Sequence, residues 1–175
     1  RDREVGDVAI QAALNGHLVF STLHTNDAPS AITRLIDMGI KPFLVASSIQ
    51  AIMAQRLIRV ICPECKIEDK NPNRRHLKIL GFTDEELEGK TIWKGAGCQR
   101  CGESGYRGRK GIFEMVIMNS ELRDLAFKCA PATQLRAAAR AGGMKSLVED
   151  GRLKILTGVT TPEDLLRVTQ AEGIV

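Results

Sequence analysis

Aromatic residues are scarce in this sequence of 175 residues, where they make up 4% and include one Trp and one Tyr. A core with so few rings must be packed mainly with Leu, Ile, Val, Ala and Met, which favours helix-rich architecture. The hydrophobic share still reaches 43%, enough for a chain of this length to bury a core of its own. The composition therefore indicates a globular protein of one or two domains.

Long apolar runs are also missing. The longest candidate, around residues 40–53, is interrupted by Lys41, Pro42 and Gln50, and no run reaches the roughly 20 residues that cross a bilayer. The opening sequence RDREVGDVAI lacks the basic, apolar and small-residue sections of a signal peptide. We therefore expect a cytoplasmic protein, and in that reducing compartment paired cysteines favour metal binding over disulfides.

Neither a dominant charge nor a phosphate-binding loop is present. The formal net charge is +4, and the basic runs at 74–75 and 107–110 are short, so the charge does not require a nucleic-acid partner. The pattern GxxxxGK[ST] of a P-loop does not occur in the sequence.

The spacing of apolar residues predicts an α/β organisation at the start of the chain. Helical spacing runs over residues 4–14, and HLVFSTL at 17–23 has the composition of a buried strand. A further helix is predicted within residues 27–39, with Asp27 as its N-cap and Gly39 at its C-terminal end. The apolar stretch that follows predicts a longer helix over about 42–57.

A region rich in glycine and proline, residues 62–110, predicts an inserted, loop-rich subdomain. Inside it, residues 74–80 and 83–87 predict two short helices, the second with a capping box of Thr83 and Glu86. After the subdomain, IFEMVIM predicts a strand, and three or four helices follow to the end of the chain.

Four cysteines form two CxxC pairs, a spacing that lets two thiolates in a tight turn point at one ion. Thirty-two residues separate the pairs, but loop-closure entropy grows slowly with length, so the pairs can still meet. The predicted ligands of a structural zinc site are Cys62, Cys65, Cys98 and Cys101. The alternatives are unrelated buried thiols or two redox pairs, and Cys129 has no partner at useful spacing.

Segments in a particular order resemble the ATPases of type II secretion and type IV pilus assembly. They are RDRE at 1–4, GHLVFSTLHTNDA at 16–28, AQRLIRVICPEC at 54–65, GCQRCGESGYRGRKGIFE at 97–114 and TTPEDLLRVT at 160–169. The resemblance covers essentially the whole chain. It implies an α/β fold: the C-terminal part of a RecA-like P-loop ATPase core, with an inserted four-cysteine zinc subdomain and a C-terminal helical region.

On this resemblance, residues 1–61 are the C-terminal portion of the ATPase core, residues 62–110 the zinc-binding subdomain, and residues 111–175 a strand and helical region. The P-loop and the Walker B Glu of the family would lie upstream of Arg1. We therefore expect the chain to be the C-terminal half of such an ATPase, and not to turn over ATP alone.

The resemblance also identifies residues 17–24 as the family's His box and His24 as the leading nucleotide sensor. An imidazole at a strand end can hydrogen-bond a γ-phosphate or its attacking water and lose that contact after hydrolysis. Thr25 beside it is expected to bind nucleotide. The alternative is that His17 and His24 satisfy backbone groups at the ends of the strand.

Four further residues are assigned by the resemblance. Arg1, Asp2 and Glu4 resemble the acidic stretch after Walker B, of which Asp2 and Glu4 are expected to be catalytic and Arg1 to bind nucleotide. Arg56 is expected to contact the nucleotide phosphate or a neighbouring subunit. The alternatives are charges that complement a helix dipole for the first segment and a surface salt bridge for Arg56.

The parent protein implied by the resemblance is a cytoplasmic homohexamer, peripheral to the inner membrane, that hydrolyses ATP with Mg²⁺ to drive pseudopilin or pilin assembly. Its expected partners are an inner-membrane platform protein and the cytoplasmic domain of a secretion or pilus membrane component, with no nucleic acid. Two alternatives stay open. One is a zinc-ribbon nucleic-acid module, which the basic YRGRKG at 106–111 favours although aromatic residues for base stacking are lacking. The other is a zinc-stabilised docking module.

Overall fold

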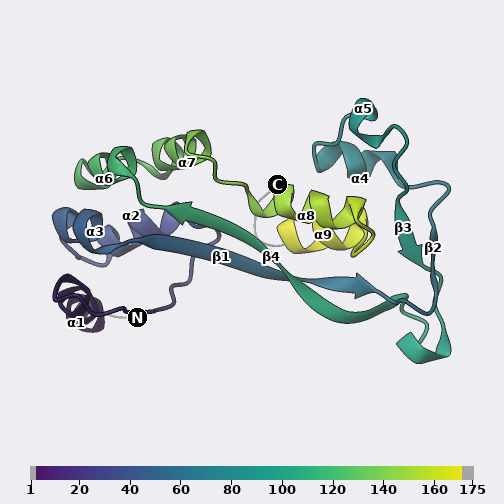
Figure 1. Cartoon of the computed structure of the whole chain (residues 1–175), viewed down its shortest axis with the longest axis horizontal. Helices are drawn as coiled ribbons and strands as arrows, with labels where there is room; N and C mark the ends of the chain where they lie inside the picture. Colours follow the sequence, from purple (N-terminus) through teal and green to yellow (C-terminus); the bar gives the residue numbers. More distant parts are fainter. Residues whose placement is uncertain (1–2, 171–175) are drawn as a thin grey trace. The chain divides into compact units, whose positions relative to one another are not determined.

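The chain forms two compact units in the computed structural model, which describes residues 3–170. The first unit comprises residues 1–54 and 114–145, and the second comprises residues 55–113 and 146–175. Figure 1 labels their helices and strands. No helix in the described range is long and apolar enough to cross a membrane.

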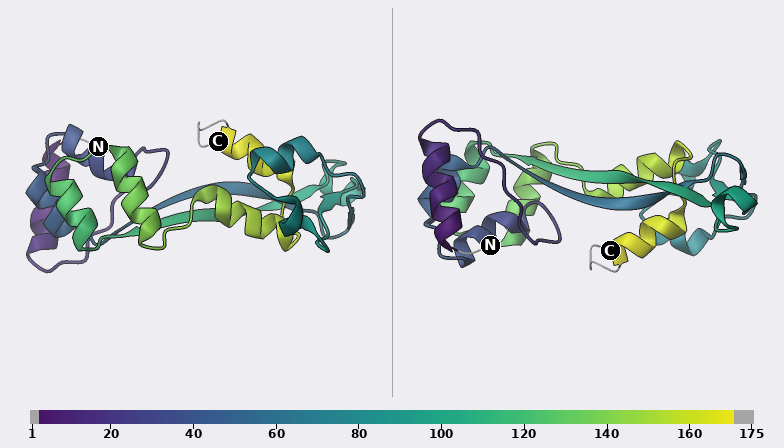
Figure 2. Two further views of the ribbon diagram at one scale, coloured as in Figure 1. Left: turned by 90° about the horizontal axis from the view of Figure 1, so that it is seen from above. Right: turned by 90° about the horizontal axis from the view of Figure 1, so that it is seen from below.

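The first unit is mainly helical. It contains α1 (Arg3–Leu14), α2 (Ser30–Asp37), α3 (Pro42–Ser48), α6 (Ser120–Phe127) and α7 (Ala132–Ala141). Helix α3 packs against α1 and α6, and α7 packs against α2 and α6 (Figure 2). The side chains buried among these helices are aliphatic, as the composition predicts, and include Ile32, Ile40, Val45, Leu122 and Leu135.

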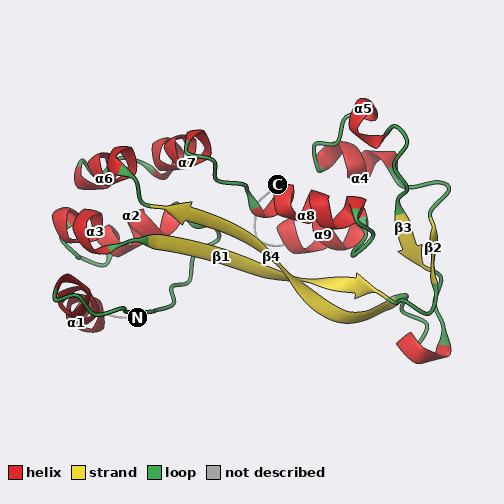
Figure 3. Ribbon diagram, in the orientation of Figure 1, coloured by secondary structure: helices red, strands yellow, loops and turns green. Residues whose placement is uncertain are grey.

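Two long strands, β1 (Ala51–Ile61) and β4 (Tyr106–Ile117), pair into a two-stranded sheet. Figure 3 shows their arrows running in opposite directions. At the end of β1 the N–H of Cys62 donates to the carbonyl of Gly105 at 2.9 Å. Exposed and less exposed residues alternate along β1 up to Ile58 and along β4 from Ile112 to Ile117, as expected for a sheet segment that is covered on one side.

The second unit holds a smaller sheet and two short helices. Strands β2 (Lys66–Glu68) and β3 (Trp93–Gly95) pair antiparallel, with Ile67 opposite Lys94. Between these strands in the chain lie the two helices α4 (Arg74–Ile79) and α5 (Asp84–Leu87).

Two C-terminal helices complete the second unit. Helices α8 (Leu147–Leu156) and α9 (Pro162–Gln170) pack against each other, and α9 also packs against α4. Leu147, Ile155 and Leu165 of these helices are fully buried.

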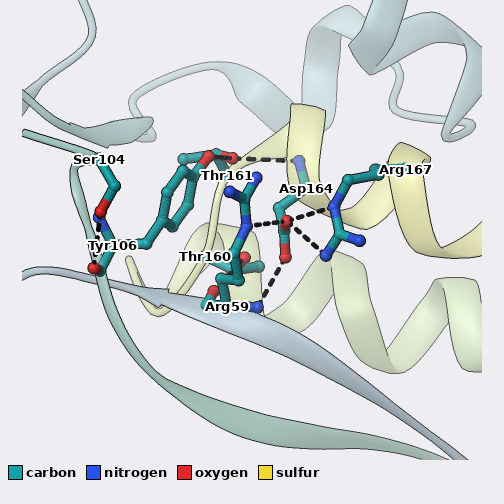
Figure 4. A network of polar contacts seen from close by, with 7 residues as sticks. All are labelled: Arg59, Ser104, Tyr106, Thr160, Thr161, Asp164 and Arg167. Atoms are coloured by element: carbon teal, nitrogen blue, oxygen red, sulfur yellow. Dashed lines mark hydrogen bonds and ion pairs between the residues drawn. The ribbon is translucent and has the colours of Figure 1, made fainter.

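A buried carboxylate joins α9 to β1 in the second unit (Figure 4). The Asp164 side chain is 0% exposed, and its oxygens accept from the backbone N–H of Arg59 at 2.6 Å, from the Nε of Arg59 at 2.6 Å and from the Nε of Arg167 at 2.9 Å. Burial lowers the pKa of Arg59, but the bond to this carboxylate outweighs it and raises the pKa overall. A buried charge requires partners of this kind.

The network extends from α9 to β4. The hydroxyl of Tyr106 lies 2.6 Å from Oγ1 of Thr161, and that oxygen accepts the backbone N–H of Asp164 at 3.2 Å. The guanidinium of Arg59 stacks over the Tyr106 ring at 4.0 Å. Burial raises the pKa of Tyr106, so its hydroxyl stays protonated and available for this bond near neutral pH.

The strand predicted over residues 17–23 is wrong in this structure. These residues form no helix or strand, and Leu18 and Phe20 are 83% and 86% exposed. A strand is stabilised by a ladder to a neighbouring strand, and among the described residues β1 pairs with β4 and β2 with β3. The composition alone therefore does not make this segment a strand.

The long helix predicted over residues 42–57 is also wrong. Helix α3 ends at Ser48, Ile49 is extended with ψ 130°, and β1 begins at Ala51. From there exposed residues alternate with less exposed ones up to Ile58, which is the period of a strand. The other predicted helices are confirmed, including the capping box of α5. Helix α2, however, begins at Ser30 with Pro29 at its N-cap position, while Asp27 accepts the N–H of Ser30 from outside the helix. The strand predicted after residue 110 is confirmed but begins earlier, at Tyr106.

Candidate metal centre

Two tight turns carry the four cysteines. Cys62 directly follows β1, and the N–H of Cys65 closes the first turn onto its carbonyl at 3.4 Å. In the second turn, a single 3₁₀ turn (η1, Gln99–Cys101), the N–H of Cys101 donates to the carbonyl of Cys98 at 3.1 Å. Each CxxC spacing thus places two sulfurs on one side of a turn, as a metal site requires.

Backbone pairing brings the two turns together across the residues that separate them. The carbonyl of Cys65 accepts the N–H of Ala96 at 2.9 Å, directly beyond the β2–β3 ladder. A Cβ added at Gly95 would collide with the carbonyl of Gly105. A glycine is therefore needed at position 95 for the two chain segments to approach this closely.

The sulfur atoms have the spacing of a tetrahedral site. Sγ atoms are 3.9 Å apart for Cys62 and Cys98, 3.9 Å for Cys65 and Cys101, and 3.6 Å for Cys98 and Cys101. All four lie within 4.8 Å of one another. An ion with bonds of about 2.3 Å to four sulfurs holds them roughly 3.8 Å apart. The cluster therefore fits a metal ion, and with four protein ligands it leaves no position open for a substrate.

Electrostatics also favour a cation in this cluster. Burial opposes ionisation of Cys101, but its Sγ accepts backbone N–H groups of Cys98 and Gly105, each at 3.3 Å, and the pKa falls to about 6. Burial and the neighbouring sulfurs raise the pKa of Cys65 to about 12. Four crowded sulfurs cannot all ionise alone, because like charges oppose one another. A divalent cation would compensate that repulsion.

Three of the residues predicted to act on a nucleotide, Glu4, His24 and Thr25, lie more than 35 positions before the first cysteine, whereas Arg56 lies six positions before it. His24 is exposed and Thr25 half-buried in the loop between α1 and α2, and Glu4 is exposed in the first turn of α1. Arg56 lies on β1 and donates from Nη1 to the carbonyl of Gln55 at 2.8 Å. The structure thus brings the four predicted metal ligands together. The roles predicted for Glu4, His24, Thr25 and Arg56 at a nucleotide stay predictions.

Two of the predicted site residues, Arg1 and Asp2, lie outside the described range. Conversely, the prediction omitted a contact near His24, in which the carboxylate of Glu114 accepts the N–H of Ala28 at 2.9 Å. The sequence does contain an indication of this contact. Glu114 is the single charged residue in the apolar strand IFEMVIM, and the alternation of a strand places it on the buried face.

Comparison with protein families gives one match over nearly the whole chain. The model of the family described as "Type II/IV secretion system protein" matches residues 1–167.

Curated relatives include proteins of both pilus and secretion systems. The type IV pilus assembly ATPase PilB of Thermus thermophilus is 45% identical over 169 residues, 97% of this chain and 19% of PilB. The type II secretion system protein E of Pseudomonas aeruginosa is 46% identical over 172 residues, 98% of this chain and 34% of that protein. The chain thus spans about a third or less of the length of these relatives.

Among solved structures, the pilus retraction motor PilT with bound ADP matches with a TM-score of 0.59 and 23% identity. The match covers 95% of this chain and 36% of that chain. At this identity the likeness concerns the fold, which is α/β in class.

Proposed function

Because the chain belongs to the type II/IV secretion system protein family, we propose that it is part of an ATPase that powers assembly of pilin-like subunits in type II secretion or type IV pili. The observation that carries the proposal is identity of 45% to a pilus assembly ATPase and 46% to a type II secretion protein E, each over nearly the whole chain. Similar identity to both classes supports the activity that they share.

His24 is the proposed nucleotide sensor of this ATPase. Its position in an exposed loop of the first unit leaves the imidazole accessible to a ligand. There it would hydrogen-bond the γ-phosphate or the attacking water, a contact that ends once the phosphate leaves. Proposed beside it for catalysis are Asp2 and Glu4, and for nucleotide binding Arg1, Thr25 and Arg56.

We propose that zinc is the ion of the four-cysteine cluster. Four thiolates in tetrahedral spacing suit Zn²⁺, and a closed site of this type is structural. Its contribution is to fix the two CxxC turns, and with them the adjoining ends of β1 and β4. Residues 62–110 are accordingly the proposed zinc-binding subdomain, between a core portion at 1–61 and a strand and helical region at 111–175.

The proposed assembly is a cytoplasmic homohexamer at the inner membrane. An inner-membrane platform protein and the cytoplasmic domain of a secretion or pilus membrane component are its proposed partners, and the zinc-binding subdomain is the proposed docking element. ATP and Mg²⁺ would be bound by the full-length protein.

The decisive experiment measures ATP hydrolysis by the full-length protein and its His24→Ala variant. We expect kcat to fall at least about tenfold, because a group that meets the reacting phosphate acts in the transition state. The matched control is His76→Ala, since His76 lies in α4 of the second unit and its Nε2 is 3.4 Å from the amide of Asn73. Unchanged turnover in His24→Ala would reject the sensor role, and a full-length protein without ATP hydrolysis would reject the proposed function.

A further inference from the structure

Glu114 is a buried carboxylate on β4 of the first unit. It is 5% exposed and shares the buried face of β4 with Val116. Burial of a carboxylate is unfavourable unless hydrogen bonds compensate for lost water. One such hydrogen bond comes from the backbone, since Oε1 of Glu114 accepts the N–H of Ala28 at 2.9 Å. Residue 28 lies in the loop that carries His24.

The preceding residue, Asp27, is held from a second direction. Its Oδ1 accepts the N–H of Ser30 at 2.8 Å, and its Oδ2 pairs with the Nη2 of Arg136 on α7. The Asp27 side chain is only 14% exposed. Burial opposes its charge, but these hydrogen bonds outweigh burial and hold the pKa of Asp27 below its usual value. The carboxylate is therefore ionised, and the ion pair formed, near neutral pH.

These contacts fix the loop within a few residues of His24. Three residues span at most about 10 Å, so anchors at 27 and 28 confine the position of the exposed imidazole. The two anchors come from β4 and from α7, 86 and 109 residues away in the chain. Confinement of this kind lowers the entropy that a reacting group loses when it meets its ligand.

We propose that Glu114 and Arg136 are positioning residues that set the place of His24 at the nucleotide. They touch no substrate themselves, and they act through Ala28 and Asp27. The inference rests on the proposed function, in which His24 senses the nucleotide, and it assigns part of that function to the C-terminal helical region.

The test is a double-mutant cycle in the full-length ATPase with His24→Ala, Arg136→Ala and the double variant. If Arg136 acts through His24, Arg136→Ala lowers kcat roughly 10- to 100-fold, with the KM for ATP within about twofold. In the His24→Ala background the second substitution then changes kcat little, because the group that it positions is gone.

Conservative variants separate positioning from loss of folding. Arg136→Lys keeps the charge and should restore most of the activity, while Gln134→Ala, an exposed position on the same helix, should match the wild type. Glu114→Gln keeps an oxygen that can accept the N–H of Ala28 and should stay near wild-type kcat, whereas Glu114→Ala should not. Thermal unfolding of each variant monitors the fold.

The outcomes are distinguishable. Equal kcat in His24→Ala and the double variant supports the positioning role. Losses that multiply in the double variant, or wild-type kcat in Arg136→Ala, overturn that role and leave the proposed function intact. A His24→Ala variant with wild-type kcat overturns both the sensor and its positioning, and a wild-type protein without ATP hydrolysis rejects the proposed function itself.

Discussion

The carboxylate of Asp164 offers a direct test of what holds α9 in the second unit, and the perturbation is Asp164→Asn. The change keeps the size of the side chain but removes its charge. It also replaces one acceptor oxygen by an amide group that donates, opposite the donors of Arg59 and Arg167. At least one of the three hydrogen bonds to residue 164 is therefore lost. The N–H groups of the new side-chain amide would then face the N–H donors of Arg59 and Arg167.

The expected loss follows from burial. Removing one partner of a buried ion pair costs roughly 3–5 kcal/mol, because the other charge is left without compensation. Both arginine side chains are partly exposed, so water can solvate their guanidinium groups after the substitution. We therefore expect the lower end of that range, about 3 kcal/mol.

The assay uses the fluorescence of Trp93, the only tryptophan of the chain, which lies on β3 in the second unit. Urea unfolding of this chain with zinc present should show a midpoint lower by about 1.5 M, taking a slope of about 2 kcal/mol per M. The matched control is Asp84→Asn, whose carboxylate pairs with Arg74 but is 82% exposed. An exposed pair contributes about 0–1 kcal/mol.

The comparison of the two Asp→Asn variants decides the question. A loss in Asp164→Asn no larger than that in Asp84→Asn would refute the reasoning, because it would mean that the buried network contributes no more than a solvated ion pair. A change of slope without a change of midpoint would instead indicate altered compactness of the unfolded chain.

Three further predictions concern the metal, one glycine and one acid. Chelation of the proposed zinc ion, or Cys62→Ser, should abolish the cooperative unfolding transition seen by Trp93 fluorescence, because the cation would compensate the charge repulsion among the crowded sulfurs. Metal analysis should find one zinc per chain. An unchanged transition in the metal-free protein would contradict a structural site. Gly158→Ala should destabilise the second unit more than Gly89→Ala in the same urea assay: both glycines have positive φ, +69° and +68°, but only at Gly158 would the added Cβ lie 2.7 Å from a Trp93 ring carbon. Equal losses would show that the left-handed backbone alone, worth about 1–2 kcal/mol, sets the cost. Burial opposes ionisation of Asp27, yet hydrogen bonds hold its pKa below the usual 3.8, so its stabilising contribution is present above that value and disappears as pH falls through the lower folded pKa. Asp27→Asn should therefore destabilise at pH 7 and much less at pH 2.5 in thermal melts followed by circular dichroism, and an equal loss at both pH values would contradict the assignment.

The sequence predicts well those helices and turns whose hydrogen bonds join residues only a few positions apart. The capping box is an example: the N–H of Glu86 donates to Oγ1 of Thr83 at 3.2 Å, and the N–H of Thr83 donates to the Glu86 carboxylate at 2.9 Å. Both bonds join residues three apart, so the pattern contains all the information that they need. The two CxxC pairs are local in the same sense, since each turn closes within four residues.

Elements that depend on distant partners were the ones missed. The predicted helix over 42–57 includes residues 51–57, because their apolar content suits either structure, and only pairing with β4 makes them part of a strand. Residues 17–23 have strand composition without a described strand beside them. The ion pair between Asp164 and Arg59 could not be predicted from the sequence either. The segment TTPEDLL is typical of a helix start, and nothing in it indicates Arg59, which lies 105 residues away.

The four-cysteine cluster and the Asp164 network lie at adjoining positions on the same pair of strands. Cys62 follows β1 directly, and one residue earlier the N–H of Ile61 donates to the carbonyl of Val159 at 2.9 Å, just before α9. On the other strand, Tyr106 begins β4 one residue after Gly105, whose N–H donates to Cys101. An ion that fixes the two cysteine turns therefore also fixes the strand ends from which Arg59 and Tyr106 reach α9. Each of these two constraints limits the motion of the same strand ends, so they should act cooperatively. We therefore expect the proposed zinc-binding subdomain and helices α8 and α9 to unfold together as one unit.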